Sequence, residues 1–313
     1  MRILAVDDEP SILELLTQIL SVFGYDEVVT APNGREALEI LRDAAKPFEC
    51  LLFDVQMPQM NGIDLCEEVR NLPDYRFTPI IMVTAMVQKQ YIDDAFEVGA
   101  SDYVTKPFEF DDLKQRLADA HRLAEERKAA ILAMEAFQDV QTVGREAHGF
   151  QLSDPVLLDA VSGFYGLAEF ENYVRKIAVS HPLNASILAI KLEEVEQLFQ
   201  ESSAEVFRST LASVGREIIS ATNGARSLAT YWGNGVFLVV LDSGKLLDLQ
   251  ALGIRLEKLV RPTSGDGVPT NSISCRIGDI IPLRASTKLE AMHLIDKAVE
   301  SADAPFQPMT LVS

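Results

Sequence analysis

Features that would place a chain outside the cell, in a membrane or on nucleic acid are scarce in this sequence. Its 313 residues include three cysteines and four histidines, and none of them pairs at the spacing of metal ligands. No apolar run reaches the 18 residues that predict a membrane helix. Acidic residues interrupt the amino-terminal stretch MRILAVDDEP, where a signal peptide would be apolar. The few scattered thiols predict reduced cysteines and a cytoplasmic protein.

Basic residues are also in short supply. Lys and Arg total 28 against 47 Asp and Glu, so the formal net charge is −19. The excess is shared, because residues 1–122 hold 11 basic and 23 acidic side chains and residues 123–313 hold 17 and 24. A chain of this charge is repelled by phosphate backbones and by anionic lipid. We therefore expect neither nucleic acid nor membrane as a partner.

Short apolar runs alternate with helix-spaced apolar residues through the first 120 positions. An amphipathic helical pattern follows each of five runs, which are Ile3–Val6, Val28–Thr30, Leu51–Phe53, Ile80–Val83 and Tyr103–Val104. Five strand–helix units predict an α/β fold, a doubly wound parallel sheet with helices on both faces. Ligands of such sheets bind outside the carboxyl ends of the strands.

Charged and hydroxyl side chains stand at those carboxyl ends. Asp7 and Asp8 follow the first strand, Asp54 the third, Thr84 the fourth and Lys106 the fifth. Crowded carboxylates at a buried edge need compensation, which Mg²⁺ and Lys106 would supply. Taken singly, an Asp-Asp pair is typical of a helix cap and a Lys-Pro of a loop. Their conjunction favours a site for magnesium and phosphate.

The segments AVDDEP, LLFDVQMPQMNG, MVTA and ASDYVTKPF, in this order, resemble the receiver domain of bacterial response regulators over residues 1–122. The resemblance implies a flavodoxin-like fold in which a sensor histidine kinase or a phosphotransfer protein phosphorylates Asp54. It also implies that Asp7, Asp8, Asp54 and the backbone carbonyl of Gln56 hold Mg²⁺.

The same resemblance implies roles for three further residues. Lys106 would pair with the phosphoryl oxygens, and the peptide bond to Pro107 is often cis in this family. Thr84 would reorient to hydrogen-bond the phosphoryl group, and Tyr103 would turn inward behind it as part of a switch. Neutralisation and positioning of this kind are what phosphoryl transfer requires.

A long helical pattern follows the predicted receiver. Neither Gly nor Pro occurs from Phe110 to Val143, and apolar or small residues recur three and four positions apart at Leu117, Ala120, Ala124, Ile131 and Met134. We interpret residues 123–155 as a helical connector. It either pairs with a second copy, giving a homodimer, or lies on its own domain; the length of the uncapped pattern favours pairing.

Residues 156–313 follow a different order. Strand patterns at 186–191, 227–232, 236–241 and 271–277 and helical patterns at 206–221 and 246–260 give the order β-α-β-β-α-β. Two of the strands flank Gly233-Asn234-Gly235, a strong hairpin signal. This order predicts an α+β, ferredoxin-like domain.

The order, the hairpin and the opening DAVSGFYGLAEF are similar to the GGDEF domain of diguanylate cyclases. That family carries two acids in the hairpin turn for metal binding and catalysis. Gly233, Asn234, Gly235 and Val236 followed by a Phe stand there in this chain, and Lys191 replaces a further metal carboxylate. Two Mg²⁺ ions and a triphosphate need those acids, so the resemblance implies a degenerate, inactive site.

The sequence as a whole is interpreted as a response regulator with a non-catalytic GGDEF-like output that acts on an unknown downstream protein or through dimerisation. Two alternatives stay open. The output domain could sense GTP or cyclic di-GMP without turnover, or it could be an active cyclase with unusual ligands. Trp232, the single tryptophan, could fill the former nucleotide pocket or mark a partner surface.

Overall fold

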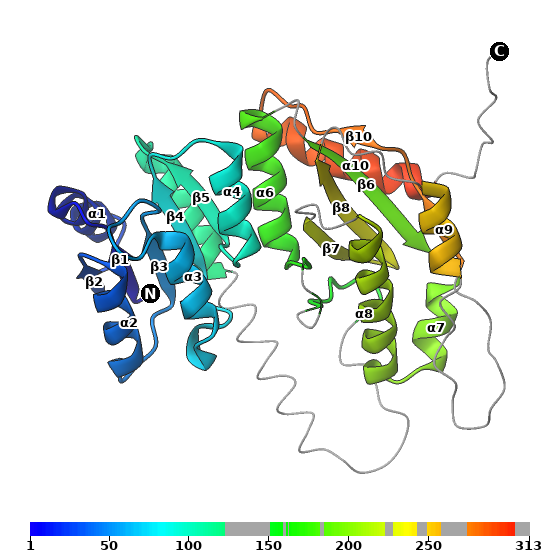
Figure 1. Ribbon diagram of the computed structural model, residues 1–313, viewed down its shortest axis with the longest axis horizontal. Helices are drawn as coiled ribbons and strands as arrows, with labels where there is room; N and C mark the ends of the chain where they lie inside the picture. Colours follow the sequence, from blue (N-terminus) through cyan, green and yellow to red (C-terminus); the bar gives the residue numbers. More distant parts are fainter. Residues whose placement is uncertain are drawn as a thin grey trace, which may run out of the picture. The chain divides into compact units, whose positions relative to one another are not determined.

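The computed structural model describes residues 1–122, 151–158, 161, 163–181, 185–222, 228–242, 249–257 and 274–303. These residues fall into two compact units that divide at Thr142 and Val143 (Figure 1). Most of the expected connector, 123–150, lies outside the described residues. Within the described parts of the chain, no helix is both long enough and apolar enough to cross a membrane.

The first unit alternates strands and helices. Its elements are β1 (Ile3–Val6), α1 (Pro10–Val22), β2 (Val28–Ala31), α2 (Gly34–Asp43), β3 (Cys50–Phe53), α3 (Gly62–Arg70), η1 (Pro73–Tyr75), β4 (Ile80–Thr84), α4 (Lys89–Glu97) and β5 (Asp102–Thr105), and residues 110–122 are again helical. The strands are parallel in the order β2-β1-β3-β4-β5. This is the flavodoxin-like order, so the predicted N-terminal fold is confirmed.

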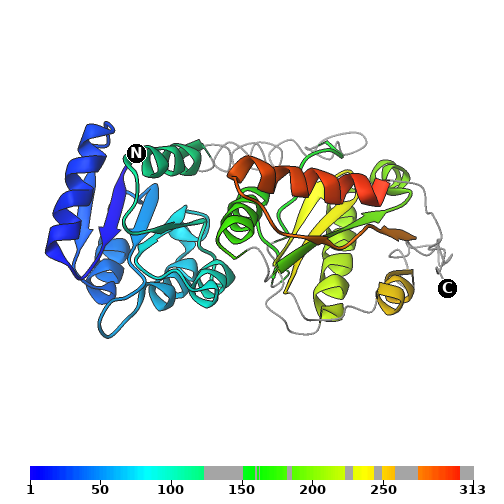
Figure 2. The same ribbon diagram turned by 90° about the horizontal axis from the view of Figure 1, so that it is seen from above.

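Burial explains why these segments became strands. Every residue of β1, β3 and β4 is buried, as expected of parallel strands covered on both faces. The core of one face joins strand side chains to α1 and to the helix at 110–122, through residues such as Leu16 and Leu117 (Figure 2). Asn33 and Asn61 cap α2 and α3 by accepting backbone N–H groups.

The second unit is built on an antiparallel sheet. Its elements are α6 (Leu167–Ser180), β6 (Ala185–Leu192), α7 (Val195–Glu201), α8 (Ala204–Ala221), β7 (Leu228–Gly233), β8 (Val236–Asp242), α9 (Leu249–Glu257), β9 (Cys275–Ile277), β10 (Ile281–Pro282) and α10 (Lys288–Asp303). The sheet order is β10-β6-β8-β7, and β9 also pairs with β6. The six elements expected from the sequence occur in the expected order.

Two layers of helices cover this sheet. Helices α8 and α9 share a core with one face, whereas α6 and α10 pack against each other, with α10 on β6 and α6 on β7 (Figure 1). Helices α6, α7 and α10 were not predicted from the sequence, although the buried residues of α10, which are Ala291, Ile295, Ala298 and Ala302, recur at helical spacing. Small alanines carry a weaker amphipathic signal than leucines would.

Candidate functional site

The carboxyl edge of the parallel sheet brings two acids to one ammonium group. β1 pairs with β3 so that Val6 lies opposite Phe53, and Asp7 and Asp54 follow them directly. The Nζ of Lys106, after β5, donates to Asp7 Oδ2 at 2.6 Å and to Asp54 Oδ1 at 2.8 Å. Only 1% of Asp7 and 6% of Asp54 is exposed. The three groups therefore form one largely dehydrated ionic cluster.

This crowding shifts the titration of its members. Burial raises the pKa of Asp54 above its usual value, and the charge of Asp7 adds to the rise although Lys106 opposes it. Burial alone would lower the pKa of Lys106, but its hydrogen bonds to Asp54 and Asp7 raise it overall. Lys106 is therefore fully charged at neutral pH. One ammonium against two carboxylates leaves the cluster net negative.

Asp8 and Gln56 are the other members of the predicted Mg²⁺ site, Gln56 through its backbone carbonyl. Both residues are exposed, and the described residues hold no group of three His, Cys, Asp or Glu side chains gathered for a metal ion. Lys106 contacts Asp7 and Asp54, and the assignment of Asp8 and the Gln56 carbonyl to a Mg²⁺ site stays a prediction. The donors that remain near the cluster are oxygens, which are the ligands of hard cations.

Thr84 and Tyr103 are both buried, on the neighbouring strands β4 and β5. Thr84 is fully buried at the end of β4, and its Oγ1 accepts the Met86 N–H at 3.4 Å. The ring of Tyr103 is also fully buried, and its hydroxyl donates to the Met86 carbonyl at 2.9 Å. Burial and then the nearby charge of Asp54 raise the pKa of this phenol. Tyr103 thus already lies inward, with the loop after β4 held against it.

Two backbone features shape the loops around the cluster. The peptide bond between Lys106 and Pro107 is cis, as the family resemblance implied. A Cβ on Gly62 would lie 2.0 Å from the backbone oxygen of Asp54, so only glycine allows the start of α3 to approach β3 this closely. The motif LLFDVQMPQMNG includes this glycine, but its packing role was missed because sequence does not reveal close approach.

In the second unit, backbone N–H groups of the turn Gly233–Gly235 are hydrogen-bonded to other residues of the same unit. The Asn234 N–H donates to the Leu152 carbonyl at 2.8 Å, and the Gly235 N–H donates to the Tyr231 hydroxyl at 2.9 Å. A Cβ on Gly233 would lie 2.3 Å from the Ser153 carbonyl oxygen. Two backbone donors that could otherwise bind an anion are thereby used internally.

Lys191 occupies an ionic network at the end of β6. It lies directly opposite Arg276 of β9, a pairing of like charges that costs stability unless it is compensated. Lys191 contacts the carboxylate of Asp303 at the end of α10, and Arg276 Nη2 lies 2.7 Å from Glu193 Oε1. Each cation is therefore matched by an acid of the same unit.

Trp232 sits where the hairpin is irregular. The register of β7 and β8 shifts between Tyr231 and Gly233, which makes Trp232 the bulged residue. Its side chain is half-buried. The neighbouring ring of Tyr231 packs edge-on against Phe237, and burial raises the pKa of Tyr231 to about 12. Packing and turn closure thus account for the aromatic residues near the hairpin.

Known proteins similar to this chain match its first part. The family model described as the response regulator receiver domain matches residues 3–118. The chain is 38% identical to the chemotaxis protein CheY1 of Helicobacter pylori over 117 residues, which are 37% of this chain and 94% of that protein. It is 37% identical to the solved structure of the chemotaxis response regulator CheY4 of Vibrio cholerae, covering 38% of this chain and 97% of that one with a TM-score of 0.36.

Larger regulators are also similar. The probable transcriptional regulator ycf27 of Porphyra purpurea is 42% identical over 125 residues, which are 40% of this chain and 49% of that protein. The chain thus spans about half the length of such curated relatives. The near-complete match to a single-domain relative, together with the parallel sheet and its acid–lysine cluster, leads to one conclusion: through its N-terminal unit, this chain belongs to the response regulator receiver family.

Proposed function

We propose that this protein is a response regulator whose Asp54 accepts a phosphoryl group from a histidine kinase or a phosphotransfer protein. One observation carries the proposal: the Lys106 ammonium bridges the buried carboxylates of Asp7 and Asp54 at the carboxyl edge of the sheet. A buried acid beside a second acid is costly. Binding of phosphate and a divalent cation at this site would explain why two acids are buried side by side.

The transfer itself needs little covalent chemistry from the protein. A carboxylate oxygen of Asp54 forms a bond to phosphorus while the phosphorus–nitrogen bond of a phosphohistidine breaks, and the imidazole keeps that electron pair and takes up a proton. Lys106 stabilises the charge on the phosphoryl oxygens, and Thr84 can turn its hydroxyl toward them. Bound Mg²⁺, held by Asp7, Asp8, Asp54 and the Gln56 carbonyl, would supply further charge neutralisation.

Phosphorylation of the full chain tests this proposal. Incubation with acetyl phosphate and Mg²⁺ should add the mass of one phosphoryl group, and peptide mapping should locate it on Asp54. The Asp54→Asn variant should gain nothing, whereas Asp43→Asn, which changes an exposed acid at the end of α2, should behave like the wild type. Modification of the Asp54→Asn variant at the wild-type rate would refute the assignment.

The second unit is proposed to be a degenerate GGDEF-like domain of ferredoxin-like fold without cyclase activity. Its order β6-α8-β7-β8-α9-β9 and its antiparallel sheet support the fold. The loss of function is supported by the internal use of the Asn234 and Gly235 N–H groups and by the pairing of Lys191 with Asp303. The two turn donors and the acids nearest Lys191 and Arg276, which are Asp303 and Glu193, are thus already engaged within the unit, whereas a triphosphate with two metal ions needs such groups.

Two measurements separate this proposal from its alternatives. Incubation of the full chain with GTP and Mg²⁺ should yield no cyclic di-GMP, and turnover would reveal an active cyclase. Calorimetric titration with GTP and with cyclic di-GMP should show no binding, and saturable heat would instead identify a nucleotide sensor. Because the N–H groups of Asn234 and Gly235 are hydrogen-bonded within the chain, we expect neither turnover nor nucleotide binding.

Without chemistry of its own, the second unit is proposed to act through protein–protein contact, with the connector forming a homodimer. Size-exclusion chromatography with light scattering, with and without beryllofluoride and Mg²⁺, should show a change in mass that Asp54→Asn abolishes. Pull-downs with the same pair of proteins would then identify the downstream partner. An identical response from both proteins would refute phosphorylation-controlled assembly.

A further inference from the structure

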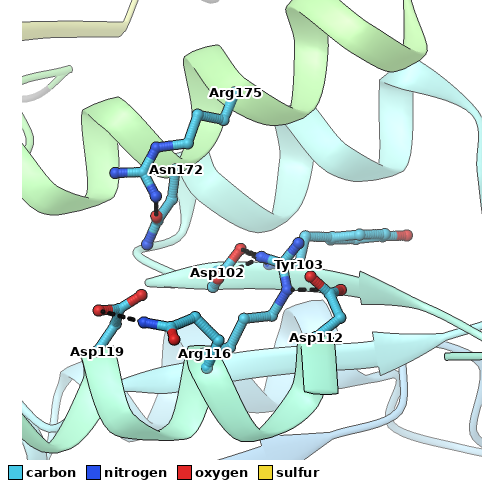
Figure 3. Close-up of polar contacts among 8 residues, drawn as sticks. Asp102, Tyr103, Asp112, Arg116, Asp119, Asn172 and Arg175 are labelled. Atoms are coloured by element: carbon cyan, nitrogen blue, oxygen red, sulfur yellow. Dashed lines mark hydrogen bonds and ion pairs between the residues drawn. The ribbon is translucent and has the colours of Figure 1, made fainter. Parts of the chain in front are cut away.

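A buried ion pair ties the last described helix of the first unit to β5. Arg116, on the helix at 110–122, contacts both carboxylate oxygens of Asp102 and places its Nε 3.1 Å from Asp112 Oδ2 (Figure 3). Only 5% of Asp102 is exposed, and the exposed fraction of the Arg116 side chain is 14%. A planar guanidinium with several fixed donors makes a stiffer link than an ammonium would.

The acid of this pair is also part of the strand that serves the phosphorylation site. Asp102 is the first residue of β5, and its Oδ1 accepts the N–H of Tyr103 at 2.7 Å. The next residues along β5 lead directly to Lys106, which holds Asp7 and Asp54. One short strand therefore bears the switch tyrosine and the anchor of the helix, and the site lysine follows it directly.

We propose that Arg116 is a positioning residue that makes the helix at 110–122 move with β5, so that a change of charge at Asp54 reaches the segment leaving the receiver. This inference rests on the proposed phosphorylation of Asp54. A phosphoryl group pulls on Lys106 and changes the packing of the loop against Tyr103, and both residues belong to or adjoin β5. Because breaking a buried pair by removing one partner is strongly unfavourable, the helix follows the strand.

Hydrogen exchange measured by mass spectrometry tests this coupling in the full chain. In the wild type, beryllofluoride with Mg²⁺ should change the exchange of peptides from residues 110–122. In Arg116→Ala, phosphorylation of Asp54 by acetyl phosphate should persist, but the exchange response of the helix should fall below about half of the wild-type change. Arg116→Lys keeps the charge without the fork geometry and should restore part of the response.

A matched control lies one position away. Gln115 makes an exposed contact with Asp119 on the same helix, so Gln115→Ala should respond like the wild type. Should Arg116→Ala fail to fold, Asp112→Ala decides the question, because it removes the less buried partner of the guanidinium and should reduce the response in a folded receiver.

The possible results separate this inference from the proposed function. If the wild-type chain takes up no phosphoryl group on Asp54, the proposed function fails. If the wild type is phosphorylated but the helix does not respond, or if the Arg116 and Asp112 variants respond as fully as Gln115→Ala, only the coupling role of Arg116 is overturned. A purely structural role would speed exchange in both states and leave the response to beryllofluoride intact.

Discussion

Replacing Lys106 with methionine should destabilise the first unit by about 3 kcal/mol at neutral pH. The change removes the only cation that contacts Asp7 and Asp54 within the described structure and leaves two buried carboxylates facing each other. Removing one partner of a buried pair costs about 3–5 kcal/mol. We expect a cost at the lower end of this range, because 16% of the Lys106 side chain is exposed. Water can therefore partly replace the lost ammonium group.

The penalty should depend on pH in a defined direction. The folded-state pKa of Asp54 is already raised, so its contribution to stability is present below the usual aspartate range and is lost as the pH rises through the raised value. Without Lys106 that pKa rises further, and the variant loses about 1.4 kcal/mol per pH unit over the added interval. The difference from the wild type should therefore be small at or below the usual aspartate range and grow as the pH rises toward neutrality.

The measurement must report on the first unit alone. The single tryptophan, Trp232, belongs to the second unit, so its fluorescence does not detect unfolding of the receiver. Hydrogen exchange of the most protected amides of β1 and β3 does. A loss of about 3 kcal/mol corresponds to exchange that is roughly 100-fold faster where exchange requires unfolding of the unit.

Lys46→Met provides the control, since Lys46 is an exposed lysine of the same unit. It should change exchange in β1 and β3 by less than about threefold, as is usual for surface substitutions. The electrostatic reasoning is refuted if Lys106→Met costs less than about 1 kcal/mol, or if its cost is the same near pH 4 and near pH 7.

Three further outcomes are expected. Gly62→Ala should destabilise the first unit by about 1–3 kcal/mol, measured by the same exchange experiment, because its Cβ would lie 2.0 Å from the Asp54 carbonyl oxygen; wild-type exchange would contradict this. Gly233→Ala should speed exchange at the hairpin turn, because its Cβ would lie 2.3 Å from the Ser153 oxygen; unchanged protection would show that the contact is not formed in solution. Adding EDTA should leave the denaturant midpoint followed by Trp232 fluorescence unchanged, because Asp303 and Glu193 are paired with Lys191 and Arg276; a lower midpoint would reveal a structural metal there.

The elements of the first unit were predictable because their signals are local. Runs such as Ile3–Val6 and Ile80–Val83 are apolar at every position, and helical spacing follows each. Helix α8 of the second unit, which carries leucine, isoleucine and phenylalanine at regular spacing, was equally clear. Helix α10 was not, because its buried side chains include three alanines.

The arrangement of the sites depends on contacts between residues that are far apart in the chain. Lys106 and Asp7 are 99 positions apart in the chain, and the contact between them depends on strand order and register. Register also decided that Lys191 lies opposite Arg276. The use of the Asn234 N–H by Leu152 depends on the packing of a distant segment.

The sequence by itself thus determined most of the segments that form strands and helices and which side chains stand at the ends of the strands, because periodicity and turn chemistry act over a few residues. Only the tertiary structure decided which of those side chains meet, that Tyr103 lies inward, and that the hairpin turn is closed by its own chain. Such contacts join residues far apart in the chain, and they follow from the packing of whole layers.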